Sequence, residues 1–188
     1  MSWPPPSLPA GPARVAIVAL LLGAVIIAFS GIFAKLSELG PSATAFHRFF
    51  IALPILWLWL SVGTTPGPKL AQMPRDDRRH LMLAGLFLGL DIAVWHWALK
   101  FGSVTNGTLL GNTAPVWVVI FGWSLFGRRV TRLFLVGLAL SIGGTAILVG
   151  GSFTFSPDHA IGDGLGLGAG ALYAAYIMAL GHARQRHG

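Results

Sequence analysis

The chain has 188 residues, of which 54% are hydrophobic and only 10% are charged, whereas a typical soluble domain has about 25% charged residues. This composition argues against an aqueous enzyme, because a soluble fold could not cover so much apolar surface, and against intrinsic disorder, which needs the opposite balance. The absence of cysteine excludes disulfides, thiol catalysis and cysteine metal sites. The formal net charge of +7 would suggest nucleic acid binding in a soluble protein.

Six apolar stretches follow one another along the chain. A transmembrane helix needs about 20 predominantly apolar residues. The candidates are residues 15–34, 43–62, 81–99, 104–126, 133–151 and 165–181. The sequence therefore predicts an all-α polytopic membrane protein with about six transmembrane helices. The first apolar run is longer than the core of a signal peptide, so we expect a retained helix.

The basic residues predict the orientation of these helices. With a cytoplasmic N-terminus, ten of the thirteen Lys and Arg residues lie on the inner side, Lys35 and Lys100 lie outside, and Arg48 lies within the second span. The positive-inside rule then places both termini in the cytoplasm, with the proline-rich residues 1–14 as a mobile tail. We expect the cell (plasma or inner) membrane as the location and the lipid bilayer as the partner. Because topology explains the basic excess, no nucleic acid partner is expected.

The fourth span contains a predicted helix break. Pro115 lies at its middle, so the carbonyl of Gly111 loses its helical donor. Asn112 adds a second polar group nearby. A free carbonyl is costly in lipid unless it faces protein or water. Two interpretations remain open: a kinked helix beside a polar cavity, and a kink satisfied by a neighbouring helix.

Small residues recur at four-residue spacing in the last three spans. The clearest stripe lies in the sixth span and consists of Gly162, Gly166, Gly170 and Ala174. Such stripes allow helix backbones to approach closely. They predict tight helix packing.

Asp91 is the leading functional residue because it is the eleventh of nineteen residues in the third span. An intramembrane carboxylate is costly unless it is paired, protonated or hydrated; the alternative is a buried structural contact. Arg48 lies at a depth from which it could reach Asp91, or it could extend to lipid headgroups. Trp95 is one turn from Asp91 on the same face. His96 points about 140° away and is either a proton-linked group or a packing histidine.

No catalytic constellation accompanies these residues. There is no G-x-S-x-G motif, no second carboxylate at membrane depth and no metal-ligand spacing. We therefore expect no enzyme activity, no catalytic residue, no metal and no cofactor. Tyr173 and Tyr176 lie deep in the sixth span, where they could line a cavity or pack against lipid. The candidate substrate-binding or coupling residues are Asp91, Trp95, Asn112, Pro115, Arg48, His96, Tyr173 and Tyr176.

Two stretches carry a family resemblance. They are Asp91-Ile-Ala-Val-Trp-His-Trp-Ala-Leu-Lys100, continuing to Pro115, and Phe126-Gly-Arg-Arg-Val-Thr131 followed by spaced glycines. This pattern resembles EamA-type members of the drug/metabolite transporter superfamily. The resemblance implies a permease for a small-molecule substrate, a metabolite or drug-like compound, that works by alternating access and favours export. A separate hypothesis is that Asp91 titrates during the cycle and so couples transport to protons. One departure is Arg128, where the family commonly has glutamate.

The same family usually has ten helices in two inverted repeats of five. Residues 20–34 and 165–179 share six identities in fifteen positions, which is consistent with an inverted repeat. We therefore expect one EamA-like repeat at 15–151. Residues 152–188 would supply an outer loop, the first helix of a second repeat and a basic tail, in a chain truncated after its sixth helix. The alternatives are an inactive fragment and a non-transporting membrane subunit that needs a partner chain, either a second transporter half or another copy.

Overall fold

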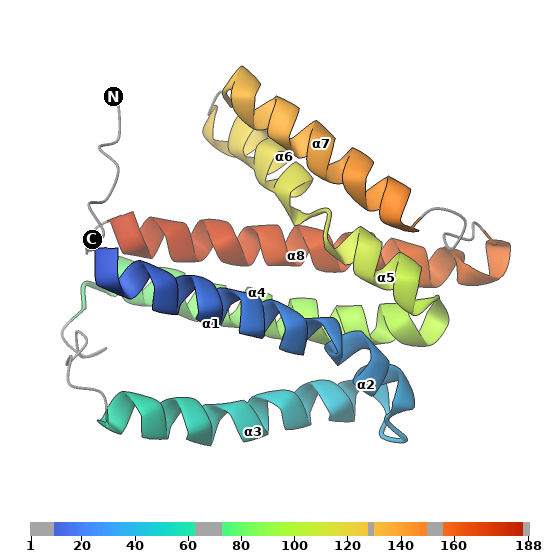
Figure 1. The fold of residues 1–188 in the computed structure, drawn as a ribbon, viewed down its shortest axis with the longest axis horizontal. Coiled ribbons are helices and arrows are strands. Elements are labelled where there is room, and N and C mark those ends of the chain that lie inside the picture. The colour runs from blue at the N-terminus through green and yellow to red at the C-terminus, as the bar shows by residue number, and fades with distance from the viewer. Residues whose placement is uncertain (1–9, 63–72, 128–129, 150–155, 186–188) are drawn as a thin grey trace.

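The structure, a computed structural model, describes residues 10–62, 73–127, 130–149 and 156–185 (Figure 1). Every regular element in these ranges is helical, so the predicted all-α fold is confirmed. The helices are α1 (Ala10–Ala28), α2 (Ser30–Leu36), α3 (Pro41–Val62), α4 (Arg75–Phe101), α5 (Val104–Gly111), α6 (Ala114–Phe126), α7 (Arg132–Val149) and α8 (Ala160–Gln185), with a 3-10 turn at Pro157–His159.

Five of the six predicted spans correspond to segments that are long and apolar enough to cross a membrane. These segments are Ile17–Leu36, Pro41–Val62, Arg75–Phe101, Val104–Phe126 and Pro157–Gly181. The remaining predicted span corresponds to a shorter apolar helix, Arg132–Ile147. Many large apolar side chains on these helices are exposed, as expected for side chains that face lipid.

Three helices begin several residues before the predicted spans. Helix α1 begins at Ala10, within the stretch expected to be a mobile tail, and residues 1–9 lie outside the described part. Helices α4 and α8 begin at Arg75 and Ala160, several residues before the predicted spans. The first turn of α4 is charged, and that of α8 contains Asp163 and glycine, so neither forms part of an apolar run.

The first span is interrupted at Phe29, which separates α1 from α2. The sequence analysis did not predict this interruption. A Ser30-Gly31 pair lies at the start of α2, and such pairs are common where helices bend. Gly31 is buried, and a Cβ there would lie 3.1 Å from Cγ1 of Val104. The missing side chain therefore lets α2 lie close to α5.

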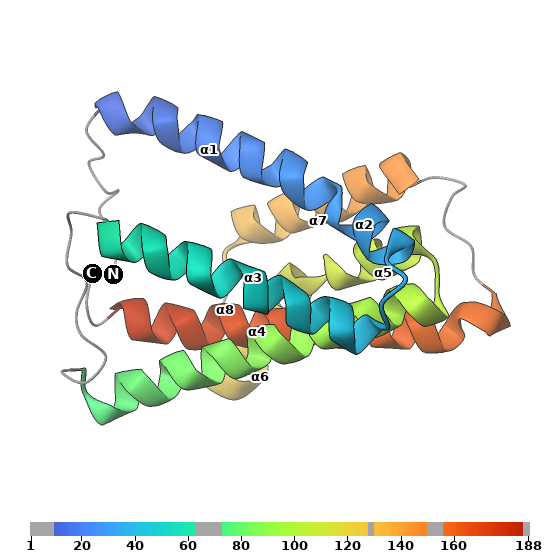
Figure 2. The same cartoon turned by 90° about the horizontal axis from the view of Figure 1, so that it is seen from below.

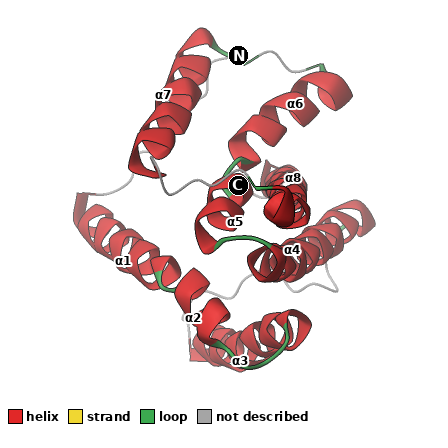
Figure 3. Cartoon of the chain, turned by 90° about the vertical axis from the view of Figure 1, so that its right-hand side faces the viewer, coloured by secondary structure: helices red, strands yellow, loops and turns green. Residues whose placement is uncertain are grey.

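Helices α4 and α8 lie side by side and form the centre of the molecule (Figures 1 and 2). Helices α5 and α6 pack on α8, while α3 packs on α4. Helix α7 lies apart from the α4–α8 pair, toward the edge of the molecule (Figure 3). The third and sixth spans, far apart in sequence, are thus the closest neighbours.

The glycine stripe of α8 confirms the prediction of close packing. All four of its residues are buried. A Cβ at Gly162 would collide with the backbone of Gly102, and a Cβ at Gly166 would lie 3.0 Å from the Cβ of Leu110. The stripe therefore brings α8 against α5 and against the turn between α4 and α5.

The break in the fourth span is also confirmed. Helix α5 ends at Gly111 and α6 begins at Ala114. The Thr113 hydroxyl donates a hydrogen bond to the Leu110 carbonyl. The Gly111 carbonyl faces α8, where a Cβ at Gly170 would lie 3.1 Å from its oxygen. The structure therefore supports the second interpretation, because a neighbouring helix lies against the freed carbonyl. The Asn112 side chain next to it is exposed.

Candidate functional site

Asp91 lies half-buried on α4, in the part of that helix that is apolar enough to cross a membrane. Its carboxylate interacts electrostatically with Arg48 on α3 and with Tyr173 on α8. Charged side chains at this depth usually face a protein interior or a water-filled space rather than lipid. Asp91 is therefore flanked by polar groups from the two helices that pack on α4.

Arg48 lies over an aromatic ring rather than in direct contact with the carboxylate. Its Cζ is 6.0 Å from the centre of the Trp95 ring, a geometry suited to a cation–π interaction. Within the described residues, no ion pair of 4.0 Å or less joins Arg48 to Asp91. The predicted proximity of the two spans holds, and the arginine is directed toward α4. The two charges therefore interact electrostatically without a direct ion pair.

Trp95 connects more elements than any other candidate residue. A Cβ at Gly31 of α2 would lie 3.8 Å from its ring, and a Cβ at Gly111 of α5 would lie 3.3 Å from it. Arg48 of α3 covers the same ring. Both glycines leave room for the indole, so α2, α3, α4 and α5 meet at Trp95, one turn from Asp91.

The other candidates divide between this site and its surroundings. The rings of Tyr173 and Tyr176 are tilted against each other with centres 5.5 Å apart, and Tyr173 also interacts with Asp91. Asn112 and Pro115 lie on the α5–α6 break, with exposed side chains. The break adjoins the site through the glycine that contacts the Trp95 ring.

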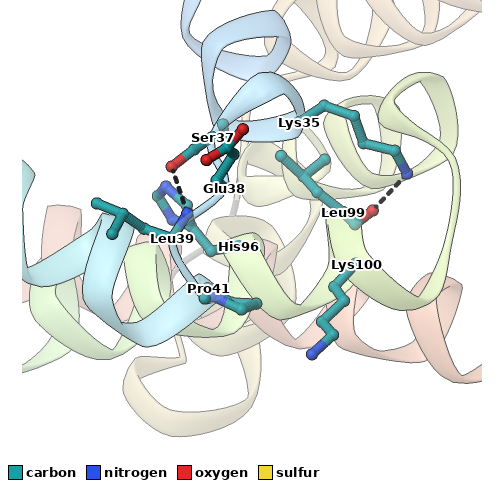
Figure 4. A pocket seen from close by; sticks show the side chains of 10 residues that line it. Lys35, Ser37, Glu38, Leu39, Pro41, His96, Leu99 and Lys100 are labelled. Atoms are coloured by element: carbon teal, nitrogen blue, oxygen red, sulfur yellow. Dashed lines mark hydrogen bonds between the residues drawn. The ribbon is translucent and has the colours of Figure 1, made fainter.

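His96 lies beside this site on a different face of α4 from Asp91, as its helical position predicts. It is buried, its Nδ1 is 2.7 Å from the Ile92 carbonyl oxygen, and its ring meets that of Trp95 edge-on at 5.2 Å. It lines a separate cavity where α2, the connection to α3 and α4 come together (Figure 4).

Comparison with known proteins identifies the family. The sequence profile of the EamA-like transporter family matches residues 14–150. The chain belongs to the EamA-like transporter family. An "Uncharacterized transporter" of Archaeoglobus fulgidus is 34% identical over 166 residues, which cover 85% of this chain and 55% of that protein. The chain thus spans about half the length of this relative. No solved structure matches.

This EamA-family chain also has an apolar groove that the sequence did not predict. The groove has a volume of about 610 Å³ and lies between α4, α6 and α8, with Phe87, Phe121 and Ile177 among its lining residues. Phe87 is one turn before Asp91 on α4. The groove therefore ends close to the polar site. It depends on which helices are neighbours, and the local sequence pattern contains no such information.

Asp163 is a buried carboxylate that the sequence pattern placed before the sixth span. Asp163 lies in the first turn of α8, within the apolar segment Pro157–Gly181, and is 9% exposed. Asn106 of α5, fully buried, donates a hydrogen bond of 3.0 Å to Oδ1 of Asp163. Asp163 lies inside a helix because α8 begins five residues before the predicted span. The helical spacing of Gly162 and Gly166 around Asp163 was the signal that could have revealed this.

Proposed function

We propose that this chain carries a substrate-binding site of a secondary transporter that moves small metabolites or drug-like compounds across the cell membrane by alternating access, in the direction of export. The observation that carries the proposal is Asp91, an intramembrane carboxylate with Arg48 and Trp95 beside it. Membership of a transporter family supports the same assignment.

The groups around Asp91 suit recognition of a small polar or amphipathic solute. The site combines one negative charge, one positive charge and aromatic faces. Charges of both signs bind complementary substrate groups strongly where water is scarce. An apolar part of the solute would find room in the groove that begins at Phe87. Asp91 would bind substrate and proton alternately, which would couple transport to a proton gradient.

The interrupted first and fourth spans support a conformational cycle. Helix pairs α1–α2 and α5–α6 are each broken within a single predicted span. Broken helices of transporters line binding sites and give points where segments move separately. Both breaks lie next to Trp95, through Gly31 and Gly111. A substrate that moves the indole would therefore act on both broken helices.

The proposed orientation has both termini in the cytoplasm. Lys35 and the end of α4 lie together at one end of the bundle, where Lys35 Nζ donates to the Leu99 carbonyl oxygen. The arginines at the start of α4, Arg75, Arg78 and Arg79, lie at the other end of that helix. The positive-inside rule makes the arginine-rich end cytoplasmic.

We propose further helices as the other wall of the cavity, supplied by a second transporter half or by another copy of this chain. The relative's greater length supports this idea. In the alternative, the chain is a fragment or subunit that does not transport alone. Co-purification of a second helical chain with the wild-type protein would favour the subunit.

Flux into proteoliposomes tests the proposed function. The purified chain would be assayed with radiolabelled amino acids, nucleosides and sugars and with cationic dyes, against protein-free liposomes. We expect at least one class to move faster, and Asp91→Asn to abolish that flux. Asp158→Asn removes an exposed carboxylate and serves as the matched control. If no class moves faster with the wild-type chain, transport by this chain alone is wrong.

A further inference from the structure

Helix α2 lies next to the Asp91 site at one end of the bundle. It follows the break at Phe29 and contacts α4 and α5. A Cβ at Gly31 of α2 would lie 3.1 Å from Cγ1 of Val104 and 3.8 Å from the Trp95 ring. Because Trp95 is one turn from Asp91 on the same face of α4, α2 covers the aromatic edge of the site.

Lys35 ties the far end of α2 to the end of α4. Its Nζ donates to the Leu99 and Gly102 carbonyl oxygens at 3.0 and 3.4 Å, and Figure 4 draws the first of these bonds. The last carbonyls of a helix have no donor within that helix. A cation at a helix C-terminus is also favoured by the helix dipole. The ammonium of α2 is therefore bound to acceptors of a different helix.

Between these two attachments, α2 is packed loosely. A cavity of about 320 Å³ lies between the end of α2, the connection to α3 and the last turns of α4, and the large apolar side chains of α2 are exposed. The other short half-helix, α5, differs. A Cβ at Gly166 of α8 would lie 3.0 Å from the Cβ of Leu110, and Asn106 donates to the buried Asp163. Close contacts thus hold α5 on α8 more firmly than α2 on α4.

The opposite end of the bundle is open beside the same site. The apolar groove between α4, α6 and α8 extends from His80, near the start of α4, to Phe87, one turn before Asp91. The surroundings of Asp91 are therefore reached by a groove from the start of α4 and covered by α2 toward its end.

We propose that α2 is a gate over the Asp91 site, with its hinge at the break at Phe29 and Lys35 as its latch. The structure describes the state in which this gate is closed and the groove is open. Release of Lys35 from the α4 carbonyls would let α2 move away from α5 and uncover Trp95. A gate has a role only if a solute passes the Asp91 site, so this role rests on the proposed function.

The reactivity of a cysteine beneath α2 tests the latch without a transport assay. The chain has no native cysteine, so Val104→Cys in nanodiscs can be labelled with a membrane-impermeant maleimide, which reaches both faces. We expect slow labelling, and roughly ten-fold faster labelling after Lys35→Met, as for loss of a hydrogen bond from a charged donor. Lys35→Arg keeps N–H donors and should keep labelling slow. Lys100→Met removes a neighbouring cation that lies over the Trp97 ring and should also leave labelling slow.

A buried cysteine elsewhere distinguishes gate opening from unfolding. Ala169→Cys replaces a side chain of α8 that is 0% exposed, and it should stay unreactive when combined with Lys35→Met. Three results would each overturn the latch: unchanged labelling of Val104→Cys after Lys35→Met, equal acceleration by Lys100→Met, and equal acceleration at Ala169→Cys.

A disulfide tests the gate itself. A Cβ at Gly31 would lie 3.1 Å from Cγ1 of Val104, which suits a disulfide, whose Cβ atoms are about 3.5–4.5 Å apart. In the double variant Gly31→Cys with Val104→Cys, we expect oxidation to stop the flux of any solute that the wild type moves, and a reductant to restore it. Flux that continues after oxidation would overturn the gate. Absence of flux in the wild-type chain, together with faster labelling after Lys35→Met, would instead count against the proposed function alone.

Discussion

The close approach of Gly162 to the backbone of Gly102 predicts a large effect from a single methyl group. In Gly162→Ala, the new Cβ would lie 2.6 Å from Cα of Gly102 and 2.7 Å from the carbonyl carbon of Phe101. Ordinary contacts of this kind begin at 3.4 Å. The neighbouring atoms belong to backbone, so no side chain can rotate away. Helix α8 would have to move by about 1 Å from the α4–α5 turn, which weakens dispersion contacts along the interface.

The expected loss of stability in Gly162→Ala can be compared with a control variant in the same helix. Overpacking of this kind costs about 1–3 kcal/mol of unfolding free energy. Gly164→Ala introduces the same methyl group two residues away, where nothing lies within 4 Å, so it should stabilise α8 by up to about 1 kcal/mol through helix propensity. The assay is thermal unfolding of both variants in the same detergent. If Gly162→Ala is as stable as Gly164→Ala, the close approach of α8 to Gly102 is wrong.

Three further substitutions follow from the same contacts. Asn106→Leu leaves the Asp163 carboxylate without its 3.0 Å donor and should lower the free energy of unfolding by about 1–3 kcal/mol. A double variant with Asp163→Leu should recover part of this loss. Purely additive losses would contradict an interaction between the two side chains. Lys35→Met removes the donor to the Leu99 carbonyl and should cost about 1 kcal/mol in the same unfolding assay. Trp95→Ala should abolish flux in proteoliposomes with little change in expression, whereas unchanged flux would remove Trp95 from the site.

The sequence predicted features that depend on local pattern. Apolar runs located the five segments that are long enough to cross a membrane and one shorter apolar helix, and Pro115 located the helix break. The stripe that includes Gly162 predicted a close helix contact, because only small residues permit one. These predictions succeeded because bilayer thickness and backbone hydrogen bonding constrain the chain locally.

Features that depend on the choice of neighbours could not be predicted in this way. The pairing of α4 with α8 creates the groove at Phe87, and the packing of α5 on α8 buries Asp163 against Asn106. The break at Phe29 was also missed, because a Ser-Gly pair is compatible with both a straight and a bent helix. The polar cavity lined by His96 forms because the ends of α2 and α4 lie close together. No residue spacing within either helix predicts that proximity.

The central claim, a polar substrate site at Asp91 within the membrane, is tested most directly by chemical accessibility. The chain contains no cysteine, so single cysteines can be introduced without background. The variants are Asp91→Cys and, as a lipid-facing control on the same helix, Leu86→Cys, whose native side chain is exposed and apolar. Both would be treated in proteoliposomes with a membrane-impermeant maleimide. We predict rapid labelling of Asp91→Cys and negligible labelling of Leu86→Cys, whereas equally unreactive cysteines would contradict a water-accessible site at Asp91.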